Sequence, residues 1–368
     1  MKKKIIALSL TAAALASLCA CGPQIPDVTE KSASTTADSS QTSATEEEKP
    51  NIELTIQDSS VNMPDIGNFR IAASFHGSDE KTVDTVSIKP LEFDSQKLTE
   101  TFFGDQKVSQ QVGDNMTFFK TADTNLEYDS GYEFGSSLTY YTEKGLALNE
   151  LFQFTDYPLK TDELTFKKPD EAKTIVTDIL KGLDLPVPQT FKVQSLSHED
   201  LQTICDNFDK YKTAQNVPLM EPLTNYKFSG EDDIYILSWI SILNGLDSAM
   251  GMRYAIISNN GLEFMSLRSL ATADQVVQVD DNSIISVEDA VAGVYEKYKE
   301  NNYEKLFTVS DISLGYMISG SNSFSPVWFF SGTIGDELFR WGVDAYTGEV
   351  SMYDIDSTAS GQNILAQL

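Results

Sequence analysis

The sequence predicts an α+β fold in which antiparallel β-sheets are packed by helices. Three segments place apolar residues at the spacing of one helix face, and several others show the alternation of β-strands and end in tight turns. Hydrophobic residues make up 41% of the 368 residues and aromatic residues 10%, which is sufficient for a sizeable core. The chain is therefore expected to fold around buried sheets.

Each of the three expected helices has a recognisable beginning. The first spans Pro169–Gly182, with acidic residues in its first turn and a lysine and a glycine at its end. The second follows Ser197, whose hydroxyl can cap the first turn while Asp200 completes a capping box. The third runs from Ser286 to about Asn301, with acids first and lysines last, as the helix dipole favours.

Strands are expected before, between and after these helices. Ile234–Leu243 is apolar on both faces, which is typical of a central strand covered on each side. Met252–Met265 is typical of a hairpin, because Asn260-Gly261 favours a tight turn. The other predicted strands are Met116–Lys120, Ser137–Thr142, Leu146–Leu148, Val327–Ile334, Phe339–Ala345 and Glu349–Met352.

The N-terminus has the order of parts of an export signal. A cationic head, Met1–Lys4, precedes the uncharged and mostly apolar run Ile5–Leu18, which is shorter than the roughly 20 residues of a membrane-spanning helix. The next residues, Leu18–Cys21, resemble the bacterial lipobox. This resemblance implies that residues 1–20 are a lipoprotein signal peptide and that Cys21 carries the lipid, a palmitate-type anchor. The alternative is a soluble secreted protein cut nearby.

Residues 21–50 are expected to form a disordered tether behind the lipidated cysteine. They are rich in Ser, Thr, Ala and Glu and contain no aromatic residue, so they cannot bury enough apolar area to offset the entropy of ordering. With Cys19 removed and Cys21 modified, Cys205 is the last cysteine, and no internal disulfide is expected.

The acidity of the chain excludes one class of partner. The formal net charge of −28 repels phosphate backbones, so nucleic acid is not an expected partner. Carboxylates in such excess are most simply explained by solubility outside the cell.

The sequence predicts no catalytic, cofactor or metal site. Its two histidines, His76 at the end of a strand and His198 in an exposed first helical turn, have no His or Cys neighbour at ligand spacing. Cys205 lies on the apolar side of its helix and is expected to be a buried thiol. No G-x-S-x-G, G-x-G-x-x-G or Walker-type pattern is present. A carboxylate pair acting on a glycan stays open, because 55 acidic residues offer many pairs.

Aromatic residues in the predicted strands are the candidate binding residues. They could line a groove for a peptide or a sugar, or they could fill the core of a sheet, which is the commoner role of strand aromatics. The five candidates are Tyr140, Tyr141, Trp239, Trp328 and Trp341.

The C-terminal part of the chain resembles a PepSY-type unit. The resemblance lies in an acidic-Ala helix start at Ser286–Ala290, a strand with Pro and Trp at Ser325–Phe329, and the closing sequence Val343–Val350. A weaker repeat precedes it, since Tyr254 and Trp341 are separated by the same 87 residues as Met265 and Met352.

This resemblance implies a domain order and a role. Two PepSY-like helix-plus-sheet repeats, 166–275 and 276–368, would follow a mainly β region, 51–165. Related modules occur in YycI/YycH-type regulators and in uncharacterised lipoproteins of Gram-positive bacteria, where they contact other proteins. We therefore expect a binding or regulatory module without enzymatic activity, lipid-anchored on the outer face of the membrane, with an unidentified protein or peptide partner. The alternatives are a solute or glycan receptor and a carboxylate-dependent hydrolase.

The lipid anchor gives a first prediction. Mass spectrometry of the native protein is expected to find an acyl-bearing thioether on the sulfur of Cys21, which is then the N-terminal residue. An unmodified sulfur on a protein recovered from the cytosol would contradict the expected location.

Overall fold

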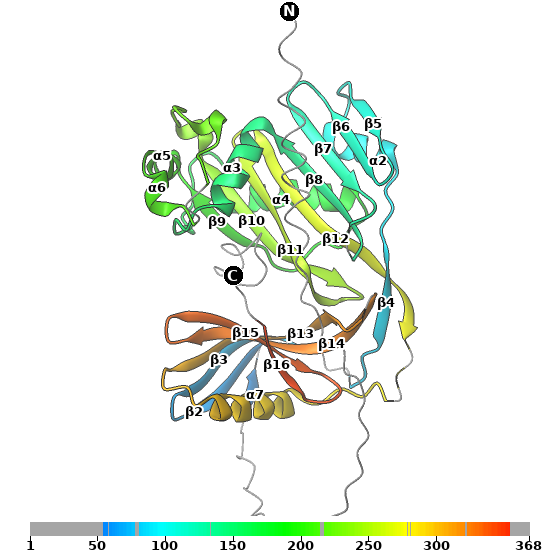
Figure 1. The fold of residues 1–368 in the computed structure, drawn as a ribbon, viewed down its shortest axis with the longest axis vertical. Coiled ribbons are helices and arrows are strands. Elements are labelled where there is room, and N and C mark those ends of the chain that lie inside the picture. The colour runs from blue at the N-terminus through cyan, green and yellow to red at the C-terminus, as the bar shows by residue number, and fades with distance from the viewer. Residues whose placement is uncertain are drawn as a thin grey trace, which may run out of the picture. The chain divides into compact units, whose positions relative to one another are not determined.

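The predicted α+β class is confirmed by a computed structural model that describes residues 54–353, except 58, 78–80, 133, 214–216, 278, 280 and 321. Within these residues there are sixteen strands and six α-helices, and nearly all strand pairs are antiparallel (Figure 1). The predicted signal peptide and tether, including Cys21, lie outside the described residues.

Three parts of the chain share one order of elements, a helix followed by four strands that pair antiparallel in sequence. We call each a helix–meander unit. The first unit consists of α2 (Ser95–Phe103), β5 (Ser109–Val112), β6 (Met116–Lys120), β7 (Thr124–Asp129) and β8 (Ser136–Thr142).

The second and third helix–meander units follow the same order. The second consists of α4 (Pro169–Gly182), β9 (Lys192–Leu196), β10 (Ile234–Leu243), β11 (Leu246–Ser258) and β12 (Gly261–Val277), with α5 (His198–Asp206), α6 (Phe208–Tyr211) and two short 3-10 turns, Glu221–Leu223 and Gly230–Asp232, inserted after β9. The third consists of α7 (Val287–Asn301), β13 (Phe307–Ile318), β14 (Ser323–Ile334), β15 (Glu337–Asp344) and β16 (Val350–Tyr353).

The first two units share one sheet because their last strands pair with each other. β8 lies antiparallel to β12, with Met265 opposite Tyr140, which gives the strand order β5-β6-β7-β8-β12-β11-β10-β9. We call it the eight-stranded sheet. Helices α2 and α4 cover one face, where Leu98 and Val176 are buried. Helix α3 (Glu143–Gln153) and helix α5 cover the other face.

The third unit forms the C-terminal sheet together with the first strands of the chain. β1 (Thr55–Gln57), β2 (Ser60–Ile66) and β3 (Phe69–His76) pair in order, and β3 runs parallel to β13. The predicted region 51–165 is thus divided between two sheets, since its first strands pair with β13 and its later ones with β12.

Two links connect the sheets. Strand β4 (Thr85–Pro90) pairs with both β12 and β14. Strand β11 pairs with β13 over a short parallel stretch in which Asp247 faces Gly315. A Cβ atom on Gly315 would lie 2.5 Å from the carbonyl oxygen of Asp247, so this close approach requires glycine.

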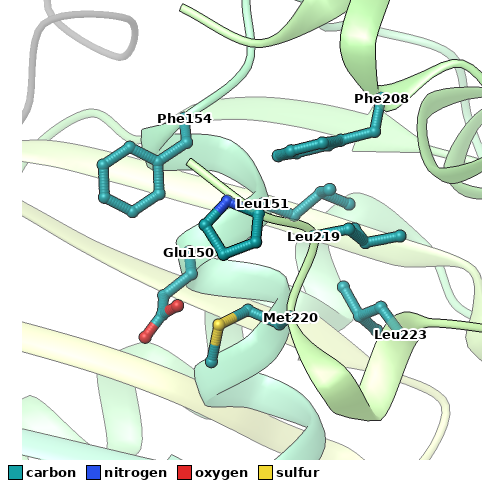
Figure 2. A pocket seen from close by; sticks show the side chains of 8 residues that line it. Glu150, Leu151, Phe154, Phe208, Leu219, Met220 and Leu223 are labelled. Carbon is teal, nitrogen blue, oxygen red and sulfur yellow. The ribbon is translucent and has the colours of Figure 1, made fainter. Parts of the chain in front are cut away.

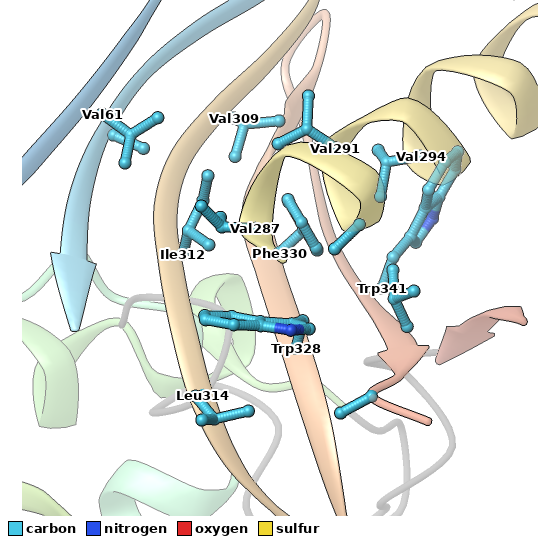
Figure 3. Packing of buried hydrophobic residues seen from close by; sticks show 14 of the residues in the cluster. Val61, Val287, Val291, Val294, Val309, Ile312, Leu314, Trp328, Phe330 and Trp341 are labelled. Carbon is cyan, nitrogen blue, oxygen red and sulfur yellow. The ribbon is translucent and has the colours of Figure 1, made fainter. Parts of the chain in front are cut away.

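Helix α7 covers one face of the C-terminal sheet (Figure 3). Its buried side chains, including Val291 and Val294, pack against Trp328, Phe330 and Trp341. Residues that point to the opposite face of β3, such as Ser74, are exposed and alternate with buried ones. Only one face of this sheet is therefore covered by a helix among the described residues.

The local predictions largely agree with these elements. Helix α4 has the predicted bounds, and β10 contributes alternate residues to the cores on both faces of the eight-stranded sheet. The capping box of Ser197 and Asp200 is present, but the helix stops before Asn207, so Phe208 lies on the separate helix α6.

The predicted strand Leu146–Leu148 is wrong, because these residues belong to α3. The hydroxyl of Thr142 accepts a hydrogen bond from the amide of Gly145 at 2.8 Å and caps this helix. A Cβ on Gly145 would lie 1.9 Å from the carbonyl oxygen of Glu263, so the helix begins in direct contact with β12.

The glycine at the link between the sheets gives a second prediction. Gly315→Ala is expected to lower the free energy of unfolding by about 2 kcal/mol or more, because the added methyl collides with backbone. Urea denaturation measures the change. Gly230→Ala is the matched control, since nothing lies within 4 Å of its Cβ, and it should change stability by less than about 0.5 kcal/mol. Equal stability of the two variants would contradict the close approach of β11 and β13.

Candidate functional site

Four of the five candidate aromatic residues are buried in the described part of the chain, so they fill the sheet cores, which is the commoner of the two roles considered for them. Tyr140, Trp239, Trp328 and Trp341 are exposed by 8%, 3%, 3% and 2%. Their strands are covered by helices of the same units, which bury the rings in the core. The fifth, Tyr141, is partly buried and donates a hydrogen bond to Glu127 at 2.8 Å. Burial and the charge of Glu127 raise the pKa of Tyr141.

A small hollow lies beside α3, on the face of the eight-stranded sheet that α3 and α5 cover (Figure 2). It holds about 180 Å³ of empty space, open solvent included, and is lined mostly by apolar side chains such as Leu151, Phe208 and Met220. Ligand pockets typically enclose about 300–1,000 Å³. Among the described residues that line it, Glu150 is the only carboxylate, and burial raises the pKa of that group. The hollow is therefore too small to accommodate most solutes.

We call the face of the C-terminal sheet that no described helix covers the open face, although part of it is buried, since Phe329 on it is 2% exposed. It carries a group of four ionisable residues that we call the charged cluster: His76, Asp247, Asp311 and Arg340. Strand pairing aligns Asp311, Ser331 and Arg340 in one row across β13, β14 and β15. The Nε2 atom of His76 lies 3.6 Å from Oδ1 of Asp311. Asp247 approaches from β11 at the link between the sheets.

Burial sets the electrostatics of the charged cluster. It raises the pKa values of both Asp247 and Asp311, and the neighbouring His76 and Arg340 offset part of the rise. The guanidinium of Arg340 lies 4.5 Å from the ring centre of Phe329, a cation–π contact that holds it over the sheet. Two half-buried carboxylates of raised pKa near an arginine form an arrangement that would bind a cationic group or transfer a proton.

Three other aspartates, Asp200, Asp232 and Asp233, are buried and form hydrogen bonds that have a structural role. Asp200 accepts hydrogen bonds from Lys160 at 2.7 Å, Tyr157 at 2.8 Å and Ser197. Burial alone would raise the pKa of Asp200, but these hydrogen bonds outweigh it and hold the pKa below its usual value.

Asp232 repeats this pattern with a second set of donors. Lys144 donates to it at 2.5 Å, Tyr226 at 2.9 Å and Ser229 at 2.7 Å. Burial again acts against ionisation, and the hydrogen bonds lower the pKa of Asp232. Both aspartates therefore belong to capping boxes and accept several further hydrogen bonds.

The histidine and the cysteine of α5 also have structural surroundings. His198 is the first residue of the helix, and its Nδ1 lies 2.7 Å from Oδ1 of Asp233, a hydrogen bond that raises the pKa of the imidazole. Cys205 is half-buried, and burial raises its thiol pKa to about 11. A thiol that stays protonated at neutral pH is a poor nucleophile. Cys205 is less buried than the sequence predicted.

The described residues contain neither a cluster of metal ligands nor a membrane-spanning helix. Across the described ranges, no three His, Cys, Asp or Glu side chains are grouped closely enough to hold a metal ion. None of the helices described combines the length and apolarity needed to cross a bilayer.

Together the fold and the charged cluster define an α+β protein built from three helix–meander units with one open, charged sheet face. No protein-family model matches the chain, and no curated protein matches it. Among solved structures, an uncharacterised protein from Eubacterium rectale ATCC 33656 is similar with a TM-score of 0.52 and 13% identity, covering 81% of this chain and 94% of that one. This similarity shows a shared fold.

A second similarity is weaker. The Bacillus megaterium YpeB C-terminal domain aligns with a TM-score of 0.33 and 12% identity, over 72% of this chain and 99% of that domain. At this TM-score the alignment carries no conclusion about the fold.

The buried carboxylate of Asp200 gives a third prediction. Because its pKa is lowered in the folded state, Asp200 contributes stability above its unfolded pKa, and this contribution is lost as the pH falls through the folded pKa. Asp200→Asn should therefore lower the free energy of unfolding by about 2–3 kcal/mol at pH 7 and by much less in acid.

Denaturant melts from pH 7 down to pH 3 measure this difference. Asp170→Asn is the control, since Asp170 pairs with Lys173 but its side chain is 90% exposed, and it should change stability by less than about 0.5 kcal/mol. A pH-independent difference for Asp200→Asn would show that the loss comes from packing and not from the carboxylate.

Proposed function

We propose that the chain is a lipid-anchored, extracytoplasmic binding or regulatory module that contacts another surface or secreted protein and catalyses no reaction. The observation that carries the proposal is the open face of the C-terminal sheet with its charged cluster. Its residues come from β3, β11, β13 and β15, so the first strands of the chain and the second and third units all contribute to it.

The charges of this face suit a protein partner with basic side chains. A Lys or Arg placed beside Asp247 and Asp311 would stabilise their ionised forms, which burial now disfavours. Arg340, held against Phe329, is a residue of the type enriched at interface hot spots. The neighbouring residues of β3 are exposed and polar or small, such as Ser74.

The repeated architecture supports the relation to PepSY-type modules. The C-terminal unit that resembles them in sequence has a helix and a four-stranded meander, and the first and second units have the same order. We therefore extend the PepSY-like assignment to the predicted repeats 166–275 and 276–368, and add the unit that begins at Ser95. The lipid on Cys21 would hold all three at the outer face of the membrane.

A hydrolase is the second candidate, because Asp247 and Asp311 both have raised pKa values and the charge of Asp247 contributes to the rise at Asp311. Turnover of cell-wall glycans or peptides by the full-length protein, lost in Asp311→Asn, would favour it over binding. The glycan-receptor alternative depends on the candidate aromatic residues, and their burial removes its support.

Site-specific crosslinking provides a fourth prediction. A photo-crosslinking residue at Ser74 of the full-length, membrane-anchored protein is expected to capture one surface protein, and Arg340→Gln should reduce that capture about tenfold, as for an interface hot spot. The control places the crosslinker at Lys297, whose side chain lies on the outer surface of α7 and is 34% exposed. Equal capture from both positions, or an unchanged yield with Arg340→Gln, would contradict the proposal.

A further inference from the structure

Three buried hydrogen-bond donors on neighbouring strands lack acceptors. Trp239 and Ser241 on β10 are 3% and 1% exposed, and Arg253 on β11 is 4% exposed. Within the residues that the structure describes, Nε1 of Trp239, Oγ of Ser241 and Nε of Arg253 have no hydrogen-bond partner. By contrast, the equally buried Trp328 donates its Nε1 hydrogen to the carbonyl of Ile285 at 3.2 Å.

The three side chains share one face of the eight-stranded sheet. Trp239 and Arg253 are directly opposite each other in the β10–β11 ladder. Ser241 lies two residues beyond Trp239 on the same strand, and residues two apart on a strand point to the same face. This is the face that α4 covers. On it Phe191 packs edge-on against Trp239, with 5.3 Å between the ring centres.

The ladder is irregular at the same place. The β11 partner moves from Met252 opposite Ile240 to Ser248 opposite Ser241, so residues 249–251 bulge out of the pairing. Bulges of this kind re-aim side chains and are frequent beside binding sites. The irregularity ends at the residue before Arg253.

Within the described ranges, no acidic side chain pairs with the charge on Arg253. Burial lowers the pKa of the Arg253 guanidinium from its usual value to about 10, and no acidic group of the described residues acts to raise it again. The guanidinium is therefore still protonated at neutral pH in a site from which water is largely excluded. A buried and unpaired charge is strongly destabilising. The chain has 55 acidic residues, yet none of the described ones is placed beside Arg253.

We propose that Arg253, Trp239 and Ser241 form a binding site for a carboxylate group. A guanidinium presents parallel N–H donors to the two oxygens of a carboxylate, and the indole N–H and the hydroxyl supply further donors. A singly charged anion neutralises the single arginine, whereas a phosphate dianion would leave a second charge buried. The carboxylate comes either from a small free acid or from the C-terminus of a peptide.

Thermal melts of the full-length protein test the site at constant ionic strength. Two carboxylate probes are used, sodium acetate and N-acetyl-dialanine, with N-acetyl-dialanine amide, sodium chloride and inorganic phosphate as comparisons. The midpoint should rise by about 5 °C at a probe concentration one hundred times its Kd. A rise with acetate identifies a free acid as the source, and a rise with the peptide acid alone identifies a peptide C-terminus. No rise with either, or equal rises with the amide, chloride or phosphate, would overturn the proposal.

Two variants and a matched control assign the effect to these residues. Arg253→Met should abolish the carboxylate-dependent shift, while Arg268→Met, at a half-buried arginine on β12, should retain it. Trp239→Phe keeps an aromatic ring but removes the N–H donor, and should weaken binding about tenfold. It also serves if the Arg253 variant fails to fold. Wild-type affinity in Trp239→Phe, or a full shift in Arg253→Met, would contradict the assignment.

Discussion

Strand edges are the constraint on which this fold depends. A four-stranded meander leaves the backbone donors and acceptors of two edge strands unpaired, and such edges pair with other chains unless they are covered. Here β8 and β12 cover each other, β3 covers β13, and β4 pairs with both sheets. These edge contacts, more than any single core residue, determine where the helices and polar groups of the three units lie.

The two sheets differ in how many of their faces are covered by described helices. The uncovered face is the one to which the proposed binding function is assigned. The eight-stranded sheet has helices on both faces, and its buried aspartates Asp200 and Asp232 are saturated by donors. The C-terminal sheet has one helix-covered face, and on the other Asp311 and Arg340 stay half-exposed. Asp200 and Asp232, whose pKa values are lowered, therefore hold the helical layer together, whereas Asp247 and Asp311, whose pKa values are raised, belong to the charged cluster.

Sequence periodicity predicted those elements whose apolar pattern and end signals lie within the element itself. Helix α4, the Ser286 cap of α7 and the central strand β10 could be predicted because each carries its own apolar pattern and end signals. The charged cluster could not, since His76, Asp311 and Arg340 meet only through pairings between distant segments. Arg253 lies within the mostly apolar strand β11. The alternation of residues along this strand indicates which face is buried, but it cannot indicate that the arginine has no counter-ion.

The junction of β8 with β12 joins like to like, because each is the last strand of its unit and the two run in opposite directions. Helices α2 and α4 also pack on the same face of the resulting sheet. Two identical copies of one unit would meet in this way about a twofold axis, as in an isologous dimer. An isolated unit thus carries the edge needed for self-association, and fusing two copies in tandem makes that association intramolecular and independent of concentration.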